Sequence, residues 1–160
     1  MLNEPVECIV NAANEKLQHN GGIAAHIHWY SVVVAVANQQ PTTNNKVFVD
    51  TFAEIARKAH TKLLDECAAI IAEQQRVVTG TSVITSAGNI NPPIYHVIHA
   101  VGPVYVDGKS GEDMLLAAAV KSVLVLATQY HIKSISIPAI SAKVSNNGDG
   151  DDDNNDYYCL

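Results

Sequence analysis

Gly21 and Gly22 are the residues best suited by type to hold a ligand. Glycine has no Cβ atom, so the backbone there can approach a bound group closely. The turn from these glycines into the helix-like residues 23–27 would point free N–H groups outward, where a pyrophosphate could accept them. Asn14 lies earlier in the chain and offers an amide donor and acceptor for ribose hydroxyls. An ordinary glycine turn is the alternative, because Gly-Gly before an apolar stretch is a weak signal.

Strands and helices must position this loop. Residues 6–10 form a β-branched run that predicts a strand, and the run stops at a polar turn that begins with Asn11. A capping-box pattern at Thr51 and apolar residues at helical spacing predict a helix over residues 51–75. The same criteria predict a second helix over residues 112–130 and further strands over residues 82–86, 95–100 and 135–138.

The order of these elements predicts an α/β fold. Strands that alternate with long helices imply crossover connections and a largely parallel sheet covered by helices. Such sheets bind ligands beyond the carboxyl ends of their strands. We therefore expect the loops at residues 11–25 and 139–144 to hold the ligand.

Charge and composition exclude several other classes of protein. The formal net charge of the 160 residues is -6, and five of the negative charges are aspartates within residues 149–156, so the rest is close to neutral. Neither nucleic acid nor a membrane surface is therefore an expected partner. The longest apolar run, residues 32–37, is too short to span a bilayer, and three widely spaced cysteines indicate free thiols in a reducing compartment. Residues 146–160 are rich in Asn, Asp and Gly, which predicts a disordered acidic tail.

Five motifs in a fixed order carry a resemblance to a known family. They read CIVNAAN at 8–14, LQHNGGIAA at 17–25, GTSVITSAG at 80–88, HVIHAVGP at 96–103 and SIPAIS at 136–141. Together they closely resemble the macro domain family over residues 3–25 and 54–105, and resemble it more loosely over residues 112–142. The resemblance implies a three-layer α/β/α fold with a mixed, largely parallel central sheet, incomplete here, and a cleft for ADP-ribose.

The resemblance also implies roles for individual residues. Asn14 resembles the asparagine on the distal ribose, Ala12 would line the adenine side, and Gly21, Gly22 and Ile23 resemble the first diphosphate loop. Ser141 and Ala142 match the start of the second phosphate loop, although Lys143 and the following residues depart from the family pattern. The expected ligand-binding set is Ala12, Asn14, Gly21, Gly22, Ile23, Ala24, Ser141 and Ala142.

The sequence departs from the family in three places. The first strand with its Gly-Asp pair and the last strand and helix of the family are missing, and residues 26–53 interrupt the first helix like an insertion. We interpret the chain as a macro-like domain over residues 1–145 with an anomalous insertion at about 26–53, followed by the tail at 146–160. A retained intron or a misplaced exon boundary is our hypothesis for the insertion, and the transcript sequence across the joins tests it.

The expected function is binding of ADP-ribose or of an ADP-ribosylated protein, by a monomer or part of a longer chain in the cytoplasm or nucleus. The first alternative is an ADP-ribosyl glycohydrolase, in which Asn14 would be the catalytic candidate. Ala24 disfavours it, since hydrolases of one class in the family have an aspartate there that activates water. Other members with alanine at this place still cleave ADP-ribosyl bonds, so the alternative stays open. The second alternative is a degenerate fragment without ligand competence. No cofactor or metal is expected, and His96 and His99 are interpreted as structural.

Overall fold

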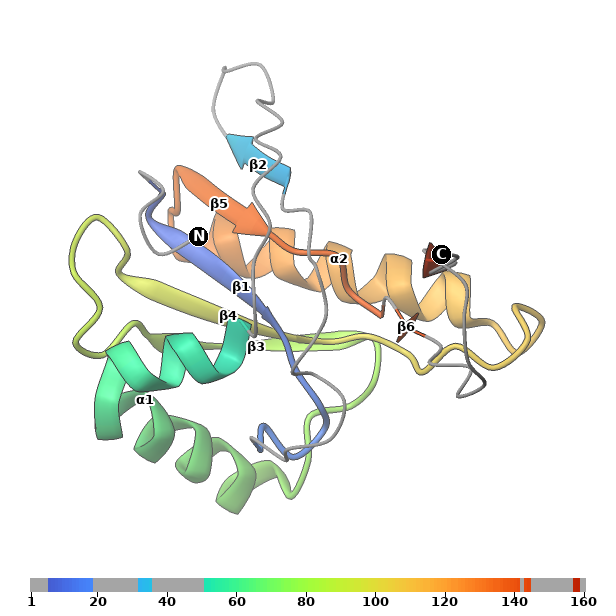
Figure 1. The fold of residues 1–160 in the computed structure, drawn as a ribbon, viewed down its shortest axis with the longest axis horizontal. Helices are drawn as coiled ribbons and strands as arrows, with labels where there is room; N and C mark the ends of the chain where they lie inside the picture. The colour runs from blue at the N-terminus through green and yellow to red at the C-terminus, as the bar shows by residue number, and fades with distance from the viewer. Residues whose placement is uncertain (1–5, 19–31, 36–50, 142, 145–156, 159–160) are drawn as a thin grey trace, which may run out of the picture.

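The computed structural model describes residues 6–18, 32–35, 51–141, 143–144 and 157–158 (Figure 1). The elements follow in the order β1 (Cys8–Ala12), β2 (Val32–Ala35), α1 (Thr51–Gln74), β3 (Thr81–Ser86), β4 (His96–Val101), α2 (Glu112–Gln129), β5 (Ser134–Ile137), β6 (Lys143–Val144) and β7 (Tyr157–Tyr158). No helix in these described ranges combines the length and the apolar character needed to cross a bilayer.

Five strands form one mixed sheet in the order β2-β5-β1-β4-β3. The central strand β1 runs parallel to both β4 and β5, whereas β2 and β3 pair antiparallel at the two edges. The expected mixed sheet is confirmed, with its parallel pairs at the centre. The short strands β6 and β7 pair with each other in a separate two-stranded sheet.

The two long helices cover opposite faces of the sheet and complete the three layers (Figure 1). Successive side chains of a strand point to opposite faces, and β1 shows this alternation. Ile9 belongs to the apolar cluster that contains Ile55 and Leu63 of α1, whereas Val10 belongs to the cluster that contains Val123 of α2. Each helix therefore buries one apolar stripe against one face of the same sheet.

Helix α1 consists of two helical pieces that meet at a kink, visible in Figure 1, and His60 at the kink has φ of 57° and ψ of -156°. This backbone conformation is almost confined to glycine. The carbonyl oxygen of Ala59 lies at the bend and accepts a hydrogen bond from the Asn89 N–H at 3.1 Å. Gly88 lies against the same peptide, and a Cβ atom at Gly88 would collide with the Ala59 carbonyl oxygen. The loop after β3 therefore fits against the bend of α1.

Three features of the fold differ from the sequence-based expectations. β1 ends at Ala12, two residues later than predicted, because its ladder to β4 continues through Asn11 and Ala12. β2 lies within the expected insertion at 26–53 and forms an edge of the sheet beside β5. The tail expected to be disordered contributes β7, which pairs with β6, while its remaining residues lie outside the described ranges. The proposed domain boundaries stay a prediction.

Candidate functional site

The carboxyl ends of β1, β4 and β5 meet at one edge of the sheet because these three strands are parallel. The Ala13 N–H donates to the Ala100 carbonyl at 2.9 Å, which holds the start of the β1 loop against β4. Gly102, directly after β4, lies against the loop after β5, and a Cβ atom there would collide with the Ser141 hydroxyl. This edge is where an open α/β sheet binds its ligands.

Asn14 closes the turn that follows β1. Its Oδ1 accepts hydrogen bonds from the backbone N–H groups of Lys16 at 3.0 Å and Gln18 at 3.1 Å, and its Nδ2 donates to the Gln18 carbonyl at 2.8 Å. The side chain is exposed, yet both ends of its amide are used within the turn. A ribose contact at Asn14 would use the second N–H of Nδ2, or would share the oxygen with the turn.

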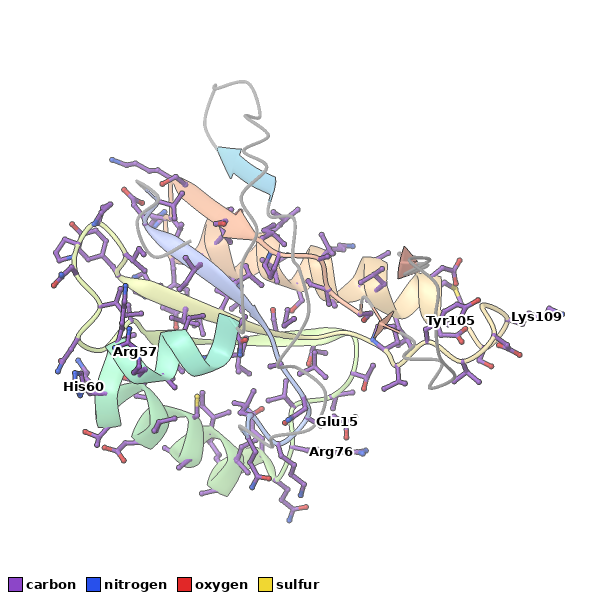
Figure 2. All side chains as sticks on the ribbon, viewed as in Figure 1. Glu15, Arg57, His60, Arg76, Tyr105 and Lys109 are labelled. Carbon is purple, nitrogen blue, oxygen red and sulfur yellow. The ribbon has the colours of Figure 1, made fainter. Side chains whose placement is uncertain are left out.

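Glu15 joins the same loop to the connection between α1 and β3. Its backbone carbonyl accepts from the Val77 N–H at 2.9 Å, and its carboxylate accepts from the Thr79 hydroxyl at 2.8 Å. The Arg76 guanidinium lies 3.5 Å from the same carboxylate, and Figure 2 shows the two side chains side by side. The pair is solvent-exposed and contributes little by charge alone, so the backbone and hydroxyl contacts carry most of the attachment.

Ser141, at this edge, has a buried hydroxyl that lacks a hydrogen bond among the described residues. Its φ of 63° is left-handed. A buried hydroxyl without a partner destabilises a fold by about 1–3 kcal/mol. A bound phosphate oxygen would satisfy such a hydroxyl.

Below the edge, a buried polar cluster connects β1 to β3, β4 and α1. The Nδ2 of Asn11 lies 3.2 Å from the His99 Nδ1, and the His99 Nε2 lies 3.0 Å from the Thr85 Oγ1 and 3.7 Å from the Cys67 Sγ. Asn11 is therefore a strand residue bonded across the sheet, which corrects its interpretation as a turn residue. The structural interpretation of His99 agrees with its complete burial.

Burial decides the protonation of this cluster. Desolvation lowers the pKa of His99 to about 4, against the attraction of the nearby Glu66 carboxylate. Burial likewise raises the pKa of the Cys67 thiol to about 11, with the negative charge of Glu66 adding to the effect. At neutral pH, His99 is neutral and Cys67 is a thiol, so the pair is not an activated nucleophile and base.

Glu112 fixes the loop between β4 and α2, and it was not among the predicted site residues. Its carboxylate accepts backbone hydrogen bonds from Val106, Asp107, Gly108 and Ser110 at 2.8–3.3 Å. Its own backbone N–H, followed by those of Asp107, Val106 and Ser110, lowers the pKa of this carboxyl to about 2, although burial opposes the shift. A glutamate that follows a glycine-rich loop and begins a helix was the available signal. Tyr105 and Lys109 mark this loop in Figure 2.

Of the eight predicted ligand residues, the structure describes Ala12, Asn14 and Ser141. Ala12 ends β1 in register with Ala100, Asn14 lies in the turn that follows β1, and Ser141 lies against Gly102 just beyond the end of β4. The other predicted residues lie outside the described ranges, namely Gly21, Gly22, Ile23, Ala24 and Ala142. All eight remain predictions as ligand contacts.

A family model described as "Macro domain" matches residues 49–147. The chain belongs to the macro domain family. One sequence relative is an uncharacterized protein of Thermotoga maritima, which is 38% identical over 90% of this chain and 19% of that protein. Another is the O-acetyl-ADP-ribose deacetylase of Escherichia fergusonii, which is 37% identical over 87% of this chain and 62% of the enzyme. The chain thus spans at most about three fifths of these relatives.

A solved structure supports the same family at the level of the fold. The macrodomain of Oceanobacillus iheyensis with ADP superposes with a TM-score of 0.62 at 26% identity, covering 88% of this chain and 60% of the other. A mutant of the same macrodomain was solved with ADPR and has the same TM-score. The predicted macro fold is therefore confirmed.

Proposed function

We propose that this macro domain binds ADP-ribose, free or attached to a protein, at the carboxyl edge of β1, β4 and β5. The observation that carries the proposal is the buried Ser141 hydroxyl at this edge, which has no hydrogen-bond partner in the part of the chain that the structure describes. Support also comes from the relative named as an O-acetyl-ADP-ribose deacetylase and from the macrodomain structures with ADP and ADPR.

The predicted residues would contact different groups of the ligand. Ser141 and Ala142 would contact phosphate oxygens from the β5 side, and the amides at Gly21, Gly22 and Ile23 would do so from the other side. Ala12 and Ala24 are too small to obstruct a nucleotide. Asn14 holds the turn over residues 14–18, and the second N–H of its Nδ2 would donate to a ribose hydroxyl.

Calorimetric titration with ADP-ribose tests the proposal, using Ser141→Ala as the informative variant. In the ligand-free protein the buried hydroxyl has no hydrogen-bond partner among the described residues, which is destabilising. Its removal should therefore raise the melting temperature of the ligand-free protein. The same change should weaken ADP-ribose binding about tenfold, since a net hydrogen bond contributes about 1 kcal/mol.

Ser122→Ala is the matched control. The Ser122 hydroxyl lies 2.7 Å from the Ser82 hydroxyl, between α2 and β3, and its loss should leave ADP-ribose affinity unchanged. Absence of both binding heat and thermal shift at millimolar ADP-ribose would reject the proposal. A degenerate fragment without ligand competence would then be the remaining interpretation.

Hydrolysis is the second candidate, and the name of the deacetylase relative favours it. Ala24 lacks the carboxylate that a general base requires, so we expect binding without turnover. Incubation with O-acetyl-ADP-ribose and with an ADP-ribosylated protein separates deacetylase from glycohydrolase activity. Release of acetate or of ADP-ribose, abolished by Asn14→Ala, would show that the chain is an enzyme.

A further inference from the structure

Among the residues that the structure describes, one cluster of buried polar side chains lies in the otherwise apolar core between α1 and the sheet. Asn11, Thr85 and His99 come from β1, β3 and β4, and Cys67 comes from α1. Asn11 is 2% exposed and His99 is 0% exposed, and the surrounding cluster consists of apolar residues such as Ile9, Leu63 and Val97. Buried polar groups weaken a core unless each is paired, so the pairing pattern indicates what this cluster does.

The hydrogen bonds of the cluster have one consistent direction. The Nδ2 of Asn11 can only donate, so the His99 Nδ1 accepts and the proton of the neutral ring lies on Nε2. The Nε2–H then donates to the Thr85 Oγ1, which itself donates to the Val97 carbonyl at 3.5 Å. The Asn11 carboxamide and the His99 ring therefore constrain each other, because only a ring with its proton on Nε2 accepts from Asn11 and donates to Thr85.

Asn11 is also the last fully buried residue of β1 before the chain leaves the sheet. The next residues lead through the Ala13–Ala100 backbone bond into the turn closed by Asn14 and attached by Glu15 to Val77. Asn11 and His99 are register partners, so their bond ties the end of β1 to β4 immediately below this loop. A change in the orientation of Asn11 would be transmitted directly to residues 12–18.

We infer that His99 is a positioning residue, which orients the carboxamide of Asn11 and thereby holds residues 12–18 in the conformation that receives the ligand. This inference rests on the proposed binding of ADP-ribose at the same sheet edge. Thr85 supports His99 by accepting the Nε2–H, and Cys67 closes the cluster from the side of α1.

Nitrogen-15 NMR of the unmodified protein gives the first test and needs no ligand. The expected result is a neutral His99 with its proton on Nε2 at pH 7, together with slowly exchanging carboxamide protons on Asn11. A proton on Nδ1, or a rapidly exchanging Asn11 carboxamide, would overturn the inference.

The second test compares His99→Phe with Val123→Ala. Phenylalanine keeps an aromatic ring in place but removes the two ring nitrogens that bond Asn11 and Thr85. Val123→Ala instead weakens the core on the opposite face of the sheet, beneath α2. Both variants should unfold more easily. Only His99→Phe should lower the affinity of the folded protein for ADP-ribose, by about tenfold or more, and Asn11→Ala added to it should cause little further loss.

Amide hydrogen exchange separates failure of this inference from failure of the proposed function. Without ligand, His99→Phe should accelerate exchange at Leu17, Gln18 and Val77 about tenfold more than Val123→Ala does. Equal exchange in the two variants would overturn the positioning role, whether or not ADP-ribose binds. If His99→Phe does not fold, Thr85→Val removes only the hydroxyl that accepts from Nε2, and a loss of affinity is expected from it as well.

Discussion

His99 can be neutral or charged near physiological pH, but its surroundings favour one form. The ring has no access to water, and its Nδ1 receives a donor from Asn11. A second proton on Nδ1 would face the Asn11 amide hydrogens and place a charge in an apolar core. Burial therefore lowers the pKa of His99 to about 4 from its ordinary value of 6.5.

This shift predicts that the folded state loses stability in mild acid. The unfolded chain takes up a proton on His99 below pH 6.5, whereas the folded chain does so only near pH 4. The stability that the neutral, buried His99 allows is therefore fully present above pH 6.5. As the pH falls towards 4, the free energy of unfolding decreases by up to about 3 kcal/mol. Denaturant unfolding at a series of pH values measures it.

The variants already described serve as controls for the pH dependence. His99→Phe should flatten the decline between pH 6.5 and 4, because the titrating group is gone. Val123→Ala lowers stability elsewhere and should keep the decline. A decline of equal size in His99→Phe would mean that other groups cause it.

Helix α1 has an internal bend instead of a straight axis, and the loop after β3 packs against the bend. The backbone of His60 takes the mainly glycine conformation, and the Ala59 carbonyl turns to the Asn89 N–H. Gly88 makes this possible because any side chain there would collide with Ala59. The bend and the loop after β3 are therefore built to fit each other.

His60→Gly should stabilise the protein by about 1 kcal/mol. Glycine relieves a backbone conformation that costs other residues about 1–3 kcal/mol, and part of this gain is offset by the greater freedom of the unfolded chain. The side chain of His60 is exposed, so little packing is lost. Chemical denaturation measures the change.

His60→Ala is the control for this prediction. It removes the same imidazole but keeps the Cβ atom that disfavours the conformation, so no gain in stability is expected. A similar gain in both variants would assign the effect to the imidazole and not to the backbone.

The sheet as a whole includes a strand from the segment that the motifs do not explain. β2 pairs antiparallel with β5 from Val32 to Ala35 and gives the sheet its outer edge on that side. The structure thus assigns part of residues 26–53 a place in the fold. This pairing does not decide whether the residues are an insertion, because an inserted segment can also add a strand to an open sheet edge.

Deletion of residues 26–53 tests the insertion hypothesis at the level of the protein. Joining Ala25 to Glu54 should leave β5-β1-β4-β3 folded, because both apolar clusters draw on these strands and on α1 and α2. β5 then becomes an edge strand, so its amides that face β2 should exchange faster while those of β1 stay protected. Loss of cooperative unfolding in the deleted protein would show that the segment is required.

Much of the fold followed from local patterns in the chain. The capping box and apolar spacing that begin at Thr51 predicted α1, and the stripe over residues 112–130 predicted α2, because helical periodicity is written in neighbouring residues. The motif at 96–103 predicted β4 and the family. Asn14 and Ser141 were placed at one edge because parallel strands end together.

Other features depended on contacts between residues far apart in the chain. The sequence showed Asn11 in a polar run typical of turns, yet its pairing with His99, 88 residues away, keeps it in β1. No local pattern shows the burial of His99, the carboxylate of Glu112 inside its loop or the buried position of the Ser141 hydroxyl. Periodicity is a property of neighbouring residues, whereas desolvation and hydrogen-bond partners exist only once the strands and helices have packed together.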